Sequence, residues 1–304
     1  MDLGGAVRVG WIGLGKMGLP MASHLVNAGH PVVGFDPSPD ARAQWVAQGG
    51  QVVGSMRECA AGAAVVFSSV PDDAALSEVA AGVFASMAPG AVFLDTSTVS
   101  PGVSADVAGA AAAAGVAYVR AAVSGNPVVA RAAALTVFVS GPQPACDRVR
   151  PLLECVGNRV FRVGDAEQAR TMKLVLNLMI AVSAGMLAEA LVLGEKGGLD
   201  WEQMLEVIGQ SAVGSPMIHY KVPPLKARDY ASTFSCRQMV KDLDLILGSC
   251  AQYGAPAPLA AQMRQAYAVL VANGSGDDDY IATVRLAERM AGIARWDGTG
   301  PTGS

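Results

Sequence analysis

Three glycines near the start of the chain have the spacing of a phosphate-binding turn. Gly13, Gly15 and Gly18 directly follow the apolar run of residues 7–12 and lead into a helix-like stretch. In this context the first glycine makes the turn, the second lets the backbone approach a pyrophosphate, and the third lets the helix pack closely on the strand. The N–H groups at the helix start can then bind phosphates. A glycine-rich turn without a ligand is the alternative.

The predicted cofactor site includes Lys16 and Met17 in this turn and continues to an acidic residue. Asp36 ends the second predicted strand, about 20 residues beyond the glycines, where a carboxylate can bond both ribose hydroxyls of an adenosine. A 2'-phosphate there would meet a like charge, and residues 37–39 include no arginine. The sequence therefore favours NAD over NADP. The alternative is that Asp36 only caps the helix expected to begin near Pro39.

Lys173 and Asn177 could act together on one reacting atom, with Lys173 as the acid or base. They lie four residues apart in a helix-like stretch, so both side chains can point to one atom. Oxidising an alcohol needs a base to take the hydroxyl proton while hydride leaves for a nicotinamide, and a partly desolvated lysine with a lowered pKa can serve. In the reverse reaction the ammonium group donates that proton. The alternative is an ordinary helix lysine whose stem packs on apolar surface while its amine stays in water.

Two kinds of periodicity divide the chain. Up to residue 164, short β-rich runs alternate with helical stretches, which is typical of βαβ units in a parallel sheet. From residue 165 the pattern is helical throughout, and residues 166–194 predict one long helix. We therefore predict an α/β Rossmann domain over residues 1–164, doubly wound with a mainly parallel sheet. The long interdomain helix joins it to an all-α domain over residues 165–304, whose high apolar content suggests oligomerisation.

Composition excludes several classes of protein. With 304 residues, 52% of them hydrophobic and 16% charged, the chain has ample material for ordered cores. The net charge of -4 and the absence of a long basic run argue against nucleic-acid binding, so the expected partner is a small molecule. Five scattered cysteines predict neither a disulfide framework nor a zinc site, and no metal is expected at the three histidines.

Targeting signals are not apparent in the sequence. The first ten residues lack the pattern of a secretory signal, so a cytoplasmic location is expected. The apolar segment 174–194 is almost long enough to cross a bilayer, but Asn177 and Glu189 lie inside it. A buried helix is therefore favoured over a membrane span.

Four motifs together carry a family resemblance. They are LDTSTVSP at 94–101, AAVSGNP at 121–127, the Lys173 and Asn177 pair in TMKLVLNLM, and KDLDL at 241–245. In this order and spacing the sequence resembles the β-hydroxyacid dehydrogenases, typified by 3-hydroxyisobutyrate dehydrogenases, over nearly its whole length. The resemblance implies NAD(P)-linked interconversion of small 3-hydroxy acids and their semialdehydes or oxo acids. It also implies a helical domain that forms homodimers or homotetramers.

The resemblance assigns roles to particular residues. Lys173 is the implied general acid/base, and Asn177 would hold the substrate oxygen and orient the lysine. The implied site for the substrate carboxylate consists of Ser124, Gly125 and Asn126.

Further residues are expected at the cofactor. By the resemblance, Lys241 approaches it from the helical domain and Phe234 is the aromatic residue that precedes this lysine; core packing is an equal alternative for Phe234. Ser97 and Thr98 follow one predicted strand, and Val70 and Pro71 follow another. Because ligands bind at the carboxyl ends of such strands, we expect Ser97 and Thr98 on the nicotinamide side and Val70 and Pro71 flanking the cofactor.

The sequence departs from the family pattern near the predicted substrate site. Asn126 stands where the family usually has a second glycine, Arg120-Ala121-Ala122 replaces Asp-Ala-Pro, and Ala133-Ala134-Leu135 replaces Gly-Thr-Leu. These changes leave the substrate's identity open. Arg120 and Arg131 could reach an anionic substrate, but we expect both at the surface.

Two other functions remain compatible with this pattern. The first is an imine reductase, or a reductase of a carbonyl without a carboxylate, on the same fold. Imine reductases commonly carry another residue in place of Lys173. The second is a non-catalytic binding protein, since some relatives use this fold in chromatin recognition and have lost the lysine.

Overall fold

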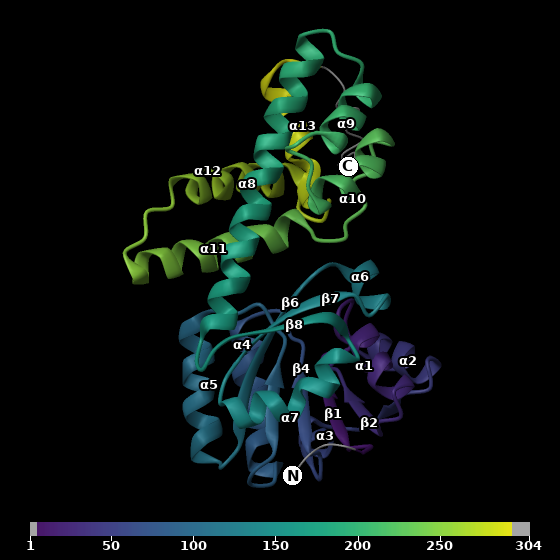
Figure 1. Cartoon of the computed structure of the whole chain (residues 1–304), viewed down its shortest axis with the longest axis vertical. Coiled ribbons are helices and arrows are strands. Elements are labelled where there is room, and N and C mark those ends of the chain that lie inside the picture. The colour runs from purple at the N-terminus through teal and green to yellow at the C-terminus, as the bar shows by residue number, and fades with distance from the viewer. Residues whose placement is uncertain (1–4, 294–304) are drawn as a thin grey trace, which may run out of the picture. The chain divides into compact units, whose positions relative to one another are not determined.

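The computed structural model describes residues 5–293 of the chain (Figure 1). The chain divides into two compact units, Met1–Lys173 and Leu174–Ser304. The limits at residues 1 and 304 of the two predicted domains lie outside the described residues.

The first unit is built on one sheet. Within the described residues eight strands pair in the order β3-β2-β1-β4-β5-β6-β7-β8. Every neighbouring pair is parallel except β6 and β7, which are antiparallel. The strands are β1 (Val9–Ile12), β2 (Val32–Phe35), β3 (Gln51–Val52), β4 (Val65–Ser68), β5 (Val92–Asp95), β6 (Ala117–Ser124), β7 (Leu135–Ser140) and β8 (Gly157–Gly164). This arrangement confirms the predicted doubly wound, mainly parallel sheet.

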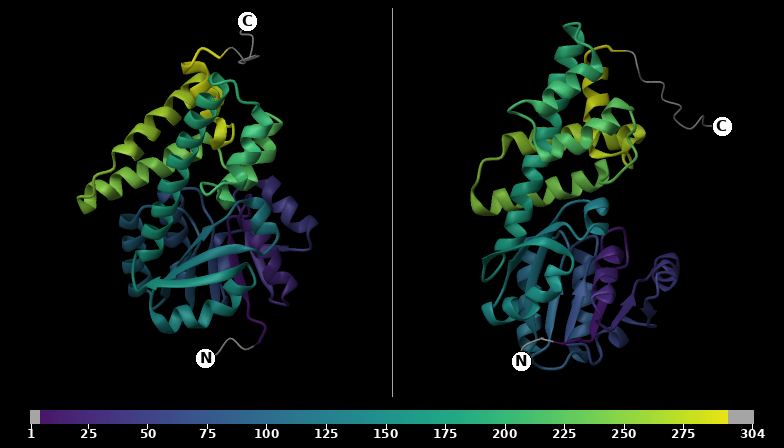
Figure 2. Two further views of the ribbon diagram at one scale, coloured as in Figure 1. Left: turned by 45° about the horizontal axis from the view of Figure 1, so that its top comes forward. Right: turned by 45° about the vertical axis from the view of Figure 1, so that its right-hand side comes forward.

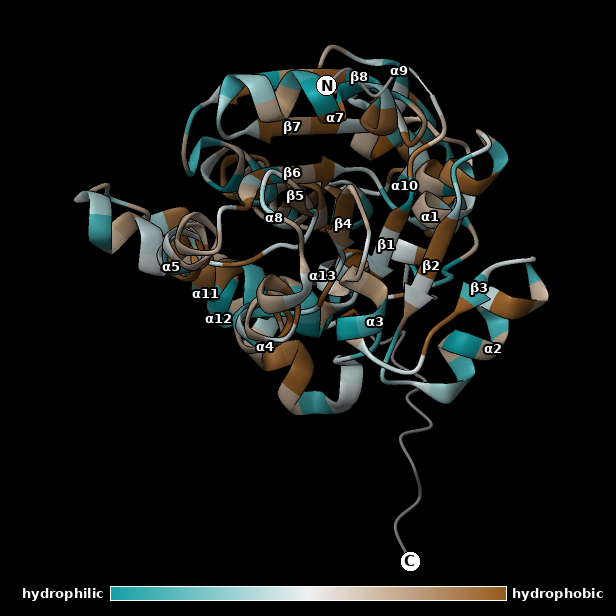
Figure 3. Cartoon of the chain, turned by 90° about the horizontal axis from the view of Figure 1, so that it is seen from below, coloured by the Kyte–Doolittle hydropathy of each residue, from teal (hydrophilic) through white to brown (hydrophobic). Residues whose placement is uncertain are grey.

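Helices cover both faces of this sheet, because its strands are apolar on both sides. In β4, Val65 and Phe67 belong to one hydrophobic core and Val66 to the other. The first core takes side chains from α1, α2, α6 and α7, and the second from α3, α4 and α5. Strands β6 and β7 are coloured largely as hydrophobic in Figure 3. The helices are α1 (Gly18–Asn27), α2 (Pro39–Ala47), α3 (Met56–Ala60), α4 (Asp73–Val83), α5 (Pro101–Ala113), α6 (Pro127–Arg131) and α7 (Gln143–Glu154).

The second unit is helical in its described part, as predicted. Its core draws on every one of its helices, and α11 and α12 lie side by side as a helical hairpin (Figure 2). The helices are α8 (Gln168–Lys196), which begins in the first unit, α9 (Trp201–Gln210), α10 (Pro216–Lys226), α11 (Cys236–Tyr253), α12 (Pro258–Leu270) and α13 (Thr283–Met290). The long helix α8 closely matches the predicted span of residues 166–194.

Helix α8 is the one described helix that is long and apolar enough to cross a membrane. Length and composition alone are weak evidence, because core helices of globular proteins pass the same test. One side of α8 contributes Ala184, Leu187 and Leu191 to the core of the second unit. The cytoplasmic location expected from the sequence stays a prediction.

Candidate active site

The glycine turn between β1 and α1 has one position with open space. Gly13 has φ +93°, and a Cβ there would lie 2.2 Å from the carbonyl oxygen of Ser69. A Cβ on Gly18 would lie 1.9 Å from the carbonyl oxygen of Gly13. These two glycines are therefore required by the fold itself. At Gly15 a Cβ would meet nothing within 4 Å, so this glycine leaves space that the protein does not fill.

The start of α1 differs from that of neighbouring helices. In the described part of the chain, no side chain caps α1 at Met17, whereas Ser38, Asp72 and Ser100 cap α2, α4 and α5. An uncapped helix start presents N–H groups and the positive end of the helix dipole. Together with the open space at Gly15, this arrangement fits the pyrophosphate of a dinucleotide.

Asp36 is bonded to the glycine turn. Its Oδ2 accepts a hydrogen bond from the N–H of Leu14 at 2.7 Å, and its Oδ1 accepts one from the N–H of Ser38 at 2.8 Å. The side chain that caps α2 is Ser38, not Asp36, so the capping alternative for Asp36 is wrong. The carboxylate instead joins the ends of β1 and β2, where an adenosine ribose is expected.

An arginine does lie beside Asp36, contrary to the expectation from residues 37–39. Helix α2 returns Arg42 to this loop, and its Nη1 donates to the carbonyl oxygens of Asp36 at 2.6 Å and Pro37 at 3.1 Å. The sequence argument against NADP therefore rests on the charge of Asp36 alone.

The loops after β4 and β5 are tied together. The Ser97 hydroxyl donates to Oδ1 of the buried Asp95 at 2.7 Å and accepts from the N–H of Val70 at 2.9 Å. Ser97 is buried, while Thr98 is half-buried and Pro71 is exposed. The loops thus hold a fixed relation at the carboxyl edge of the sheet. Contact of Ser97, Thr98, Val70 and Pro71 with a cofactor stays a prediction.

The predicted carboxylate site lies where β6 ends. Gly125 has φ +140°, and a Cβ there would lie 2.7 Å from Cδ2 of Leu135, so glycine is needed at this position. Asn126 caps α6: its Oδ1 accepts from the N–H groups of Val128 at 2.9 Å and Val129 at 3.1 Å. The residue that departs from the family pattern therefore has a structural role.

Arg120 is not at the surface, so that expectation is wrong. Its side chain is 5% exposed, forms an ion pair with Glu167, and lies 4.3 Å from the ring centroid of Tyr118. Strand β6 directs it into the first unit, where the acidic partner compensates its charge. Arg131 is exposed, as expected.

Lys173 is the last residue of the first unit, and Asn177 follows one turn later on α8. Asn177 is 3% exposed, and its Nδ2 donates to Oδ2 of Asp242, which is 1% exposed. The Nζ of Lys241 lies 3.0 Å from Oδ1 of the same carboxylate. The second unit thus brings Asn177 and Lys241, which the sequence singled out separately, to one acidic residue.

Phe234 packs in the second unit. Its ring meets that of Tyr280 edge to face, with centroids 6.2 Å apart. This contact supports the core-packing reading of Phe234, and its approach to a cofactor stays a prediction.

Three polar residues were missed by the sequence analysis: Arg42, Asp95 and Arg170. Arg170 gave one local signal, because it is a charged residue in the first turn of a long apolar helix and lies three residues before Lys173. Arg170 and Asp95 are both fully buried and form an ion pair. Their separation of 75 residues in sequence hid the pairing.

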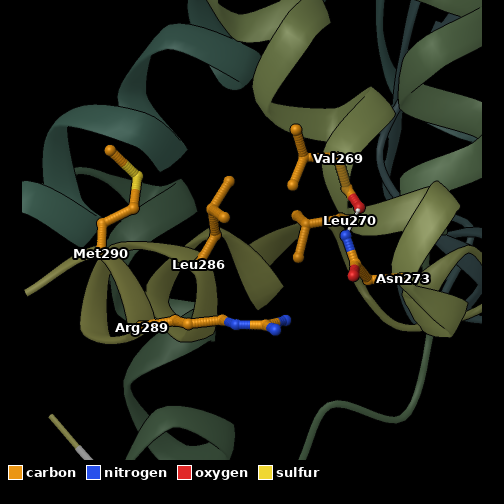
Figure 4. A pocket seen from close by; sticks show the side chains of 6 residues that line it. All are labelled: Val269, Leu270, Asn273, Leu286, Arg289 and Met290. Atoms are coloured by element: carbon orange, nitrogen blue, oxygen red, sulfur yellow. Dashed lines mark hydrogen bonds between the residues drawn. The ribbon is translucent and has the colours of Figure 1, made fainter. Parts of the chain in front are cut away.

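The three histidines and the lining of one surface hollow are not among the predicted site residues. Groups of three or more residues that could hold a metal are absent from residues 5–293. Ring nitrogens of His24, His30 and His219 each bond a backbone group. A surface hollow in the second unit contains none of the predicted site residues (Figure 4). It is lined by Val269, Leu270, Asn273, Leu286, Arg289 and Met290.

Comparisons with known proteins match both parts of the chain. Residues 8–164 match the family model of the NAD binding domain of 6-phosphogluconate dehydrogenase. Residues 168–287 match the model described as NAD-binding of NADP-dependent 3-hydroxyisobutyrate dehydrogenase.

Individual relatives cover nearly the whole chain. The 2-(hydroxymethyl)glutarate dehydrogenase of Eubacterium barkeri is 34% identical over 293 residues, which cover 95% of this chain and 97% of that protein. The 3-hydroxyisobutyrate dehydrogenase of Pseudomonas aeruginosa is 36% identical over 273 residues, covering 86% and 91%. A solved structure of Mycobacterium tuberculosis 3-hydroxyisobutyrate dehydrogenase with L-serine has a TM-score of 0.86 and 33% identity, covering 93% of this chain and 99% of that chain.

The fold and the glycine turn define an NAD(P)-binding protein with a Rossmann domain. Together with these comparisons they place the protein more narrowly. The chain belongs to the β-hydroxyacid dehydrogenase family. It is an oxidoreductase that acts on the CH–OH group of hydroxy acids. The resemblance drawn from the four sequence motifs is confirmed.

Proposed function

We propose that the protein interconverts a small 3-hydroxy acid and its semialdehyde with NAD, and that Lys173 is the general acid/base. The observation that supports this proposal is that one unit contains the glycine turn, the Ser124–Asn126 loop and Lys173. Residues 1–164 would form the cofactor domain. Residues 165–304 would serve substrate binding and oligomerisation.

The names of the relatives point to a substrate class. 2-(Hydroxymethyl)glutarate, 3-hydroxyisobutyrate and L-serine all carry a hydroxymethyl group and a carboxylate on the same carbon, and they differ in the third substituent. We propose the same core for the substrate of this chain. Its third substituent is the feature that the screen below identifies.

The carboxylate of such a substrate would bind at the end of β6. The Ser124 hydroxyl and the backbone N–H groups beside Gly125 can donate to an anion without a full positive charge. Because the Oδ1 of Asn126 accepts from α6, its Nδ2 is the amide atom that can donate to a carboxylate.

Proton transfer falls to Lys173 in this proposal. In oxidation its neutral amine takes the hydroxyl proton as hydride leaves the alcohol carbon, and in reduction its ammonium group returns that proton. The bound nicotinamide supplies the hydride acceptor in the first direction and the donor in the second. Asn177, one turn along α8, would hold the substrate oxygen, and its bond to Asp242 fixes the orientation of its amide.

NAD is proposed as the preferred cofactor because of Asp36. Its carboxylate lies where the adenosine ribose is expected and would repel a 2'-phosphate. The family model for residues 168–287 is described by an NADP-dependent enzyme, so the two cofactors are to be tested in parallel.

A substrate screen tests the function. NADH or NADPH formation is measured with 3-hydroxyisobutyrate, 2-(hydroxymethyl)glutarate, 3-hydroxypropionate and L-serine. We expect turnover of at least one acid, faster with NAD. Lys173→Met should lower kcat by about 100-fold or more while NADH still binds. Lys196→Met, at the exposed far end of the same helix, is the control and should match wild type.

Three outcomes would contradict parts of this proposal. Tight NADH binding without turnover of any hydroxy acid would reject the proposed substrate class. Reduction of a cyclic imine would instead identify an imine reductase. An active Lys173→Met variant would reject Lys173 as the acid/base. Faster turnover with NADP would reject the role given to Asp36.

We also propose that the protein forms a homodimer or homotetramer through α8. Four large apolar side chains lie exposed along one stripe of this helix: Val175 (45% exposed), Met179 (61%), Met186 (54%) and Leu193 (76%). Exposed apolar rows of this kind are typical of protein interfaces. Light scattering should show an oligomer for wild type and a monomer for Met179→Glu/Met186→Glu; monomeric wild type would contradict the proposal.

A further inference from the structure

We propose that Arg170 is a positioning residue that holds Lys173 in a fixed relation to the two loops expected beside the cofactor. The inference rests on the proposed role of Lys173. Arg170 lies one turn before Lys173 on α8, and it connects that turn to the carboxyl edge of the sheet.

Arg170 is buried and bonded on every side of its guanidinium group. It is 1% exposed. Its Nη2 donates to Oδ2 of Asp95 and, at 2.9 Å, to the hydroxyl of Tyr118. Its Nη1 donates to the carbonyl oxygen of Ser97 at 2.6 Å, and its Nε donates to the Ser104 hydroxyl at 3.2 Å. Four partners on β5, β6, α5 and the loop after β5 thus fix one side chain of α8.

The partner carboxylate extends this connection to both loops. Oδ1 of Asp95 accepts from the hydroxyls of Ser68, at the end of β4, and Ser97. The Ser97 hydroxyl in turn accepts from the N–H of Val70. A continuous chain of hydrogen bonds therefore connects α8, through Arg170 and Asp95, to Ser97 and Val70. Ser97 is held twice, by its carbonyl oxygen and by its hydroxyl.

Placing a charge at this position contributes little to stability, so its fixed geometry is the better explanation for it. A cation in the first turn of a helix opposes the helix dipole, and burial of an ion pair often contributes little to net stability. Burial by itself lowers the pKa of Arg170, but Tyr118 and Asp95 outweigh that effect and raise it above its ordinary value. Arg170 therefore stays charged, and its planar donors give fixed directions that an apolar contact would not give.

The consequence concerns Lys173. A side chain three residues farther along a helix lies on nearly the same face. If the first turn of α8 is anchored to the loops at Val70 and Ser97, the amine of Lys173 keeps a constant distance from a nicotinamide held by those loops. Misplacement of a reacting group by about 1 Å can lower a rate by about 100-fold.

The test separates positioning from stability by comparing two variants. Arg170→Met leaves Asp95 buried without its cation, so both stability and kcat should fall. Arg170→Met/Asp95→Asn removes both charges, and thermal stability should largely return. We expect kcat of this double variant to stay about 10- to 100-fold below wild type, with the KM for substrate changed by less than about threefold.

Two controls complete the comparison. Arg228→Met removes a different partly buried ion pair, with Glu288 in the second unit, and should lower stability without lowering kcat of the folded enzyme. Arg170→Lys keeps the charge but loses the forked geometry of the guanidinium group. Compared with Arg170→Met, it should regain more of the wild-type stability than of the wild-type kcat. If the double variant regains wild-type kcat together with its stability, Arg170 acts only on the fold and the inference is overturned.

A further readout keeps this inference distinct from the proposed function. Lys173 is labelled with an amine reagent, with and without saturating NADH, and its modification is located by mass spectrometry. In wild type we expect NADH to slow labelling of Lys173, and in the folded double variant we expect this protection to fall. Equal protection in both would reject the positioning role even if no hydroxy acid is turned over. Absence of turnover with protection lost in the double variant would reject only the proposed reaction.

Discussion

The amide of Asn177 donates a hydrogen bond to the carboxylate of Asp242, and both side chains are buried. Lys241 forms an ion pair with the other oxygen of that carboxylate. Asp242 therefore fixes which atom of the Asn177 amide faces α11, and it leaves the Oδ1 of Asn177 directed elsewhere. The first prediction tests this bond.

Asn177→Asp places a second carboxylate against Asp242 in a buried site. We expect the free energy of unfolding to fall by about 3 kcal/mol, because the two charges repel and the bond is lost. In Asn177→Asp/Asp242→Asn the donor and acceptor are exchanged, so most of the stability should return, while kcat stays low because the amide at position 177 is gone. Urea denaturation and steady-state kinetics check both; an unchanged stability of Asn177→Asp would show that the bond does not form in solution.

Two glycines of the same turn should respond in opposite ways to alanine. Gly15→Ala meets nothing within 4 Å, so stability should be unchanged or higher, but its methyl group occupies the phosphate space and should weaken NADH binding by about tenfold or more. Gly18→Ala should destabilise the fold by about 2 kcal/mol or more through its clash with Gly13. Gly102→Ala, another open glycine, is the control for Gly15→Ala. Unchanged NADH affinity of Gly15→Ala would place the phosphates elsewhere.

Asp36→Ser should shift cofactor preference toward NADP. The substitution removes the charge that opposes a 2'-phosphate, and Arg42 already lies at this loop. We expect the ratio of kcat/KM for NADP to that for NAD to rise by roughly 10- to 100-fold, or about 1.4–2.8 kcal/mol. Adding Arg42→Ala should reverse part of the gain. Asp40→Ser, an exposed acid on α2, should leave the ratio unchanged; an equal effect of both serine variants would contradict a specific role for Asp36.

Asn126→Asp separates the cap of α6 from substrate binding. Aspartate caps helices as well as asparagine does, so stability should change by less than about 0.5 kcal/mol. Its charge would repel a substrate carboxylate, and KM for the hydroxy acid should rise by about tenfold or more, whereas NADH affinity should not change. A wild-type KM in a stable variant would place the carboxylate away from Asn126.

Alkaline pH should destabilise the protein through its buried thiols. Burial raises the pKa of Cys59 and of Cys236 from 9.0 to about 12. The unfolded thiols lose their protons above pH 9.0 while the folded ones keep theirs, so their stabilising contribution is complete below pH 9.0 and is lost as pH rises toward 12. Each thiol should account for about 1.4 kcal/mol per pH unit in that range.

Urea denaturation in reductant at pH 8 and pH 10 measures this effect. The loss of stability between the two pH values should be smaller in Cys59→Ala/Cys236→Ala than in wild type. Cys250→Ala, at a half-buried position, should keep the wild-type difference. Equal losses in all three proteins would contradict burial of the two thiols.

Local patterns in the sequence were sufficient for the fold. Alternating apolar runs and helical stretches predicted the mainly parallel sheet and the long helix α8, because hydrophobic periodicity and turn residues depend on near neighbours in the chain. The spacing of Gly13, Gly15 and Gly18 after a strand predicted the phosphate turn for the same reason. The family resemblance followed from motifs that are each local.

Tertiary structure alone decided the partners of the charged residues. Arg120 meets Glu167 across 47 residues, Arg170 meets Asp95 across 75, and Asn177 meets Asp242 across 65. Strand order and helix packing bring residues at these sequence separations into contact. Neither leaves a signal in the sequence next to each residue. A charged side chain can be buried only where an opposite charge lies beside it. Arg120 is therefore buried, although the sequence suggested the surface. The pairing of Arg170 likewise depends on the folded chain.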